Sequence, residues 1–269
     1  MDNNMKHFIF KMIFILFLPM ELRSADWKLV WSDEFNAPKL NFSKWDICED
    51  AFGGGNQELQ LYTDRLKNVR VDNGKLIIEA HRDSPNVQGT SRKFSSGKVR
   101  TKHRGDWRYA KIEIRAKLPI GKGIWPAIWM LPTDEKYGSW AASGEIDIME
   151  LNGNNPSELL GTLHYGGQWP RNRSSGSKKK LSKGTFADEF HVFGIEWAEG
   201  EIHWTLDGES WQKQKKWSVD KIPFPAPFDQ RFHLILNIAV GGGFVGSPSL
   251  KTNFPVKMEV DWIRVYQPK

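Results

Sequence analysis

Apolar and polar residues alternate with a period of two in several short stretches of the chain. The clearest are residues 76–80, 112–115 and 202–206, and the last runs into an Asp-Gly pair at 207–208, which is typical of a tight hairpin turn. Side chains of a strand point alternately to the two faces of its sheet. These stretches therefore predict β-strands that bury one face.

Two further stretches depart from simple alternation. Residues 232–240 are almost continuously apolar, as in a strand covered on both faces. In residues 258–265 the alternation changes phase, which predicts either a bulge or burial on both faces. Helical periodicity, internal repeats and low-complexity linkers are absent after the N-terminal segment. We therefore predict an all-β fold, a sandwich of two stacked antiparallel sheets, in one domain of residues 26–269.

The N-terminal segment has the pattern of an export signal. Lys6 and Lys11 supply positive charge, residues 12–20 are apolar, and small residues stand at 24–25. The apolar run is too short to span a bilayer. We expect a signal peptide at residues 1–25 and a secreted or periplasmic protein that does not cross the membrane.

The charge and the cysteine content of the chain narrow the class of protein further. The net charge is +6 with a pI of about 9.2, and lysines cluster at residues 178–183 and 213–216. We interpret both clusters as solvated loops, with a patch for an anionic cell surface or polysaccharide as the alternative. No nucleic-acid-binding motif accompanies them, so we predict no nucleic-acid partner. We also expect a monomer. The lone Cys48 excludes an internal disulfide.

Three acids lie within six residues, at Glu145, Asp147 and Glu150. In a regular strand the first two share a face, the isoleucines at 146 and 148 point into the core, and Glu150 falls on the wrong side. A β-bulge at Ile148 or Met149 brings all three carboxyl groups to one face.

Such a cluster suits glycoside hydrolysis. A retaining enzyme needs one ionised carboxylate as nucleophile and one protonated carboxyl as acid, about 5–5.5 Å apart. A third acid between them can hold a proton or a hydrogen bond. The alternatives are a solvent-facing strand with scattered acids and a calcium site. We disfavour both because nothing in the sequence offsets the repulsion among three carboxylates.

The motif at residues 144–150, with residues 125–131 before it and 161–164 after it, resembles glycoside hydrolase family 16, and most of all its laminarinases, which are endo-β-1,3-glucanases. The resemblance extends from residue 31 to residue 266. It implies a β-jelly roll with a concave glycan-binding face. It also implies roles for the three acids, which are nucleophile for Glu145, assisting acid for Asp147 and acid/base for Glu150. The inserted Met149 matches the bulged form of the motif that β-1,3-glucanases carry.

The same resemblance implies substrate-binding residues. Trp125, Trp129 and Trp140 match tryptophans that line the cleft and stack on sugars, although core packing is the alternative, as for about half of the thirteen tryptophans. A second group is formed by His164, Asn56 and Arg100. For these the alternatives are a structural histidine, a simple loop residue and surface charge. The neighbouring Glu58 is either part of the binding loop or an acid that holds this loop.

Catalysis in this family requires no metal or cofactor, but the resemblance implies a structural calcium ion on the convex side. Its ligands would be Glu34, Asp261 and the main-chain oxygen of Gly74, and oxygen ligands suit calcium. At position 244 the chain has phenylalanine where laminarinases often have tryptophan, which puts one sugar contact in doubt.

We therefore predict an endo-acting, retaining hydrolase of laminarin-like β-1,3-glucan, with the polysaccharide as its partner. Within the enzyme class the alternative is a mixed-linkage β-1,3-1,4-glucanase or a galactan hydrolase. Outside the enzyme class, the alternative is a non-catalytic glucan-recognition protein, which the presence of all three acids disfavours.

Overall fold

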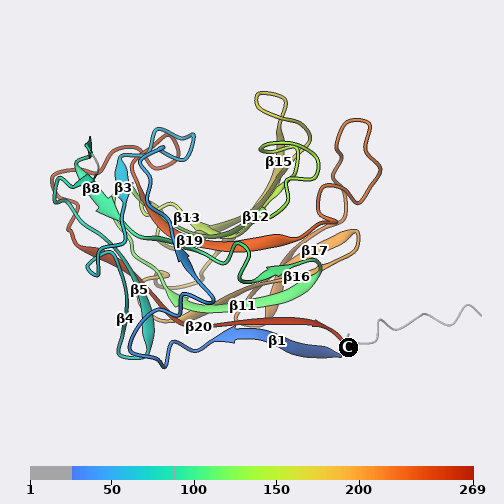
Figure 1. The fold of residues 1–269 in the computed structure, drawn as a ribbon, viewed down its shortest axis with the longest axis horizontal. Helices are drawn as coiled ribbons and strands as arrows, with labels where there is room; N and C mark the ends of the chain where they lie inside the picture. Colours follow the sequence, from blue (N-terminus) through green and yellow to red (C-terminus); the bar gives the residue numbers. More distant parts are fainter. Residues whose placement is uncertain (1–25, 88) are drawn as a thin grey trace, which may run out of the picture.

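The computed structural model describes residues 26–87 and 89–269, and this part of the chain contains strands and turns but no helix. Two eight-stranded sheets, each antiparallel, stack face to face (Figure 1). The predicted all-β sandwich is confirmed. The predicted signal peptide at residues 1–25 lies outside the described residues.

The first sheet has the order β18-β17-β16-β11-β20-β5-β4, and β1 pairs with β20. Its strands are β1 (Trp27–Asp33), β4 (Val69–Asp72), β5 (Lys75–Ala80), β11 (Ala110–Lys117), β16 (His191–Ala198), β17 (Glu201–Leu206), β18 (Glu209–Gln214) and β20 (Val256–Pro268).

The second sheet has the order β15-β14-β13-β12-β19-β9-β2, and β10 pairs with β19. Its strands are β2 (Asp46–Ile47), β9 (Lys98–Arg100), β10 (Asp106–Trp107), β12 (Ile124–Pro132), β13 (Glu145–Leu151), β14 (Glu158–Tyr165), β15 (Arg173–Lys180) and β19 (Phe232–Val240). Two small sheets complete the fold, one parallel and one antiparallel, formed by β3 (Gln60–Tyr62) with β8 (Phe94–Ser96) and by β6 (Asn86–Val87) with β7 (Thr90–Ser91).

The core lies between the two large sheets and confirms the alternation. In β11 every second residue is buried, including Ile112 and Ile114. In β20 the register against β11 skips Asp261, so the predicted change of phase is a bulge. Trp197 and Trp204 are fully buried. Burying a large apolar side chain contributes about 1.5–3 kcal/mol, so a core of this size stabilises the domain without disulfides.

The loop interpretation of the lysine clusters is correct for Lys183, Lys215 and Lys216 but wrong for the other lysines of both clusters. Lys178, Lys179 and Lys180 belong to β15, and Lys213 belongs to β18. Both strands lie at sheet edges, where lysine discourages pairing with another chain. Lys178 also forms an ion pair with Glu158 on β14, so these charges belong to exposed strand edges.

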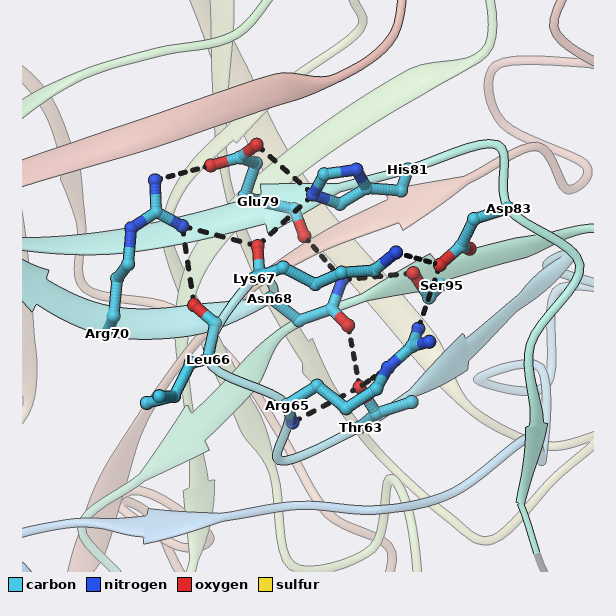
Figure 2. Close-up of polar contacts among 10 residues, drawn as sticks. All are labelled: Thr63, Arg65, Leu66, Lys67, Asn68, Arg70, Glu79, His81, Asp83 and Ser95. Atoms are coloured by element: carbon cyan, nitrogen blue, oxygen red, sulfur yellow. Dashed lines mark hydrogen bonds and ion pairs between the residues drawn. The ribbon is translucent and has the colours of Figure 1, made fainter.

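A buried polar network outside the core joins β4, β5, β8 and the loop at residues 63–68 (Figure 2). Asn68 is fully buried at its centre. Its side-chain oxygen accepts from Thr63 at 2.6 Å, and its amide donates to the Glu79 carbonyl at 2.9 Å and to Ser95 Oγ at 3.0 Å. Thr63 directly follows β3, so the network fixes the chain where it leaves this strand.

Within the described residues, no helix is long and apolar enough to cross a membrane.

Candidate active site

The three acids lie on β13, and the predicted bulge is present. Asp147 pairs with Thr162 of β14 and Glu150 pairs with Leu160, so one extra residue lies between them. Against β12 the register skips Ile148. Ile148 and Met149 are both buried in the core, and Glu150 therefore returns to the face of the other two acids.

A tryptophan from the opposite sheet supports the bulge. Trp204 of β17 donates its indole N–H to the main-chain oxygen of Asp147 at 2.8 Å. A Cβ at Gly161 would lie 2.5 Å from that indole, so only glycine leaves room for it. The bulge is thus held by a buried hydrogen bond to its own backbone.

His164 on β14 lies among the carboxylates, opposite Glu145 in the strand register. Its Nε2 atom is 3.3 Å from Asp147 and 3.7 Å from Glu145. It also packs beside Trp140, with ring centroids 5.7 Å apart. His164 therefore lies among the acids, and its role in substrate binding stays a prediction.

Two indoles orient the outer carboxylates. Trp140 donates to Glu145 Oε2 at 2.7 Å, and Trp125 donates to Glu150 Oε1 at 3.1 Å. A hydrogen bond to a carboxylate favours its charged form and fixes its rotamer. Asp147 between them is only 2% exposed and has one oxygen without a hydrogen-bond partner.

Burial raises the pKa of all three acids, and it raises those of Glu145 and Asp147 well above their usual range. Charge repulsion adds to this effect, since Asp147 raises the pKa of Glu145 and Glu150 raises that of Asp147. His164 acts in the opposite direction on Glu145 and Glu150. Three carboxyl groups this close cannot all ionise together, so the cluster retains a proton that one member can donate.

A cleft of about 640 Å³ opens at the Glu145 end of the acid cluster, where Trp140 and Gly144 line it. Trp129, Trp140 and Arg100 line it. The indole of Trp129 donates to Asn237 Oδ1 at 2.7 Å, and the guanidinium of Arg100 pairs with Asp46 at 2.8 Å. Both side chains are thereby fixed against the wall of the cleft.

Asn56 is exposed in a loop on another side of the site. Its carbonyl accepts from the amide of Gly243 at 2.8 Å, next to Phe244, whose ring packs on Trp125 with centroids 4.9 Å apart. Phe244 therefore packs against Trp125, whose indole binds Glu150. The glycine-rich loops at 52–56 and 241–246 meet here, beside Trp125 and Glu150.

Glu58 is an acid built into this rim. Its carboxylate accepts from Gln60 at 2.7 Å and lies over Gly54, where a Cβ would come within 2.0 Å of it. The side-chain oxygen of Gln60 in turn accepts from the amide of Val240. Glu58 therefore holds the loop, and its charge also raises the pKa of Glu150.

A comparison with known proteins identifies this arrangement. The family Glycosyl hydrolases family 16 matches residues 57–264, which include all three acids. The chain belongs to this family.

Family 16 relatives cover most of the chain. A glucan endo-1,3-beta-glucosidase A1 of Niallia circulans is 44% identical over 266 residues, and the match covers 93% of this chain but 39% of that protein. A beta-glucanase of Rhodothermus marinus is 41% identical, with 91% and 87% covered. The solved catalytic domain of a Thermotoga petrophila laminarinase superposes with a TM-score of 0.82 at 38% identity, covering 91% of this chain and 99% of that one.

Family 16 catalysis uses no cofactor, although Glu145, Asp147 and His164 are spaced closely enough to chelate a cation. The residues implied for structural calcium are brought near one another by strand register, because β1 and β5 both pair with β20. Their carboxylates, however, already face cations. Both oxygens of Glu34 accept from Arg264, and Asp261 pairs with Arg115. A calcium ion would have to compete with these arginines.

Sequence analysis missed several residues that shape the family 16 site. Asn237 orients Trp129 and donates to Tyr62 at 2.9 Å. Its signal was a lone amide inside the apolar run 232–240. The ion pairs of Asp46 with Arg100 and of Asp50 with Lys98 also line the cleft, but they join residues far apart in the chain and left no local pattern.

Proposed function

We propose that this protein is an endo-acting β-1,3-glucanase that retains the anomeric configuration. The observation that carries the proposal is the bulged strand, which places Glu145, Asp147 and Glu150 on one face among indole hydrogen-bond donors. The names of the Niallia, Rhodothermus and Thermotoga relatives support glucan as the substrate.

The geometry suits a double displacement. Glu145, oriented by Trp140, attacks the anomeric carbon, while Glu150 gives its proton to the departing glycosidic oxygen. This forms a glycosyl-enzyme ester and releases the first product. Glu150 then takes a proton from water, whose oxygen attacks the same carbon and frees Glu145. Asp147, buried between them, holds a proton or hydrogen bond that keeps the two roles distinct.

Product analysis tests the substrate and the mechanism together. Laminarin, lichenan, agarose and carrageenan are each incubated with the enzyme, and the anomer released first is followed by NMR. We expect β-anomeric oligosaccharides from laminarin. Activity confined to lichenan would favour the mixed-linkage alternative, and activity confined to a galactan would overturn the substrate assignment.

The Glu145→Gln variant separates an enzyme from a glucan-recognition protein. We expect it to bind laminari-oligosaccharides but to lose about three or more orders of magnitude in kcat, since the amide cannot form the ester intermediate. The indole N–H of Trp140 remains available to the new amide oxygen, so folding is preserved. Turnover equal to that of the unmodified enzyme would remove Glu145 from the nucleophile role.

Export, oligomeric state and calcium complete the proposal. The charged and apolar pattern of residues 1–25 supports secretion, which the N-terminal sequence of the mature protein would test. Lysine-rich sheet edges support a monomer, which sedimentation would test.

Strand register supports a calcium ion near Glu34 and Asp261. A rise in Tm with Ca²⁺ that EDTA reverses, without a change in kcat, is the expected result.

A further inference from the structure

Trp169 carries a large apolar side chain that is 74% exposed, in the loop between β14 and β15. Apolar residues scattered singly over a surface are ordinary. Trp169, however, adjoins a second exposed indole that belongs to the active site. Its amide donates to the main-chain oxygen of Trp140 at 3.3 Å, and Trp140 is 39% exposed while its indole N–H binds Glu145.

The loop that carries Trp169 is anchored at both ends. Gln168 accepts from the amide of Arg171, which closes a turn around Trp169. Beyond it the guanidinium of Arg173 bonds Ser218 at 2.8 Å and Asp220 at 3.0 Å. The indole is therefore presented from a fixed backbone, which lowers the entropic cost of binding a ligand.

The loop also leaves His164 after only one residue, Tyr165, which places it at the Glu145 end of the site. Trp140 lines the cleft, and the backbone of Trp169 lies directly against that of Trp140, so Trp169 stands next to this part of the cleft wall.

We propose that Trp169 forms an additional sugar-binding position, where its indole stacks on a glucosyl ring of a β-1,3-glucan chain that continues from the cleft past Trp140. This inference rests on the proposed function for the identity of the glycan. A pyranose offers an apolar face to the indole and hydroxyl groups to the exposed polar neighbours Gln168 and Arg171. A protein partner would require a wider apolar surface than this single ring.

Binding to the Glu145→Gln variant, which holds glucan without cleaving it, tests the proposal by calorimetry. Adding Trp169→Ala should weaken laminarihexaose binding roughly three- to tenfold and change laminaribiose binding much less, as expected for one lost stacking contact. Trp169→Phe should restore most of the affinity. Phe42→Ala is the matched control, because it removes another exposed aromatic ring from a turn away from the cleft. Equal weakening by Phe42→Ala would overturn the proposal.

The outcomes separate this inference from the proposed function. If the unmodified enzyme cleaves laminarin but Trp169→Ala leaves hexaose affinity unchanged, the inference fails alone. If it does not cleave laminarin yet Trp169→Ala weakens hexaose binding, the proposed function fails and the sugar position stands. If Trp169→Ala changes only the sedimentation coefficient, Trp169 contacts a second copy of the chain and the inference is overturned.

Discussion

The indole nitrogen of Trp140 lies 2.7 Å from Oε2 of Glu145, although Trp140 belongs to a loop and Glu145 begins β13 of the second sheet. The same indole packs beside His164, which also contacts Asp147. One side chain therefore orients the proposed nucleophile, favours its ionised form and forms part of the cleft wall.

We predict that Trp140→Phe separates these roles. The ring remains, but the N–H that favours the charged carboxylate is lost, so the pKa of Glu145 rises. Because Glu145 must be ionised to attack, the acidic limb of the kcat/KM profile moves to higher pH. We also expect kcat to fall roughly tenfold to a hundredfold. An unmoved acidic limb would show that the hydrogen bond does not govern this ionisation.

A second prediction concerns Asn237, which joins Trp129 to Tyr62. Asn237→Leu keeps the volume but removes both hydrogen bonds, so we expect about 2–3 kcal/mol of lost stability and a raised KM for laminarin. Tyr62→Phe is the matched control because it breaks only the bond remote from the cleft. Denaturant unfolding and initial rates of both variants distinguish the effects, and an equal KM change in both would argue against orientation of Trp129.

Particular residues show what the sequence could and could not predict. Met149 was informative because a single extra residue in an alternating strand forces a bulge, and this conflict is visible in the sequence itself. Alternation likewise predicted the sandwich. The role of Asn237 depends on which residue of β12 lies across from it, and the exposure of Trp169 depends on how a loop folds back. Both are tertiary properties, without a local pattern to signal them.

The lysines at 178–180 illustrate the opposite error. A run of like charges is typical of a loop, but here it covers an edge strand whose alternate side chains need not be apolar. Local composition therefore gave the correct exposure but the wrong secondary structure.

A third prediction addresses the network in Figure 2. Asn68→Ala leaves the buried partners at Thr63, Ser95 and the Glu79 carbonyl without their hydrogen bonds. We expect a loss of about 2–4 kcal/mol in the free energy of unfolding. Asn86→Ala, an exposed asparagine in β6, is the control and should change it by less than about 0.5 kcal/mol. Similar values for the two variants would contradict a structural role for the network.

The last prediction concerns the fourth acid, Glu58, on the rim of the site. Gln60 donates to its carboxylate, which packs closely against Gly54, and its negative charge raises the pKa of Glu150. Glu58→Gln keeps the shape and removes the charge, so the pKa of Glu150 should fall. Since Glu150 must be protonated to help the leaving group depart, the alkaline limb of the kcat/KM profile should then move to lower pH, while the acidic limb stays in place.

Glu209→Gln, at the exposed first residue of β18, is the matched control for the loss of one negative charge from the whole molecule. Its pH profile should superpose on that of the unmodified enzyme. Substrates with good leaving groups need less protonation, so the effect of Glu58→Gln at alkaline pH should shrink on them. A uniform fall in kcat at every pH, on every substrate, would instead mean that Glu58 serves only to hold its loop.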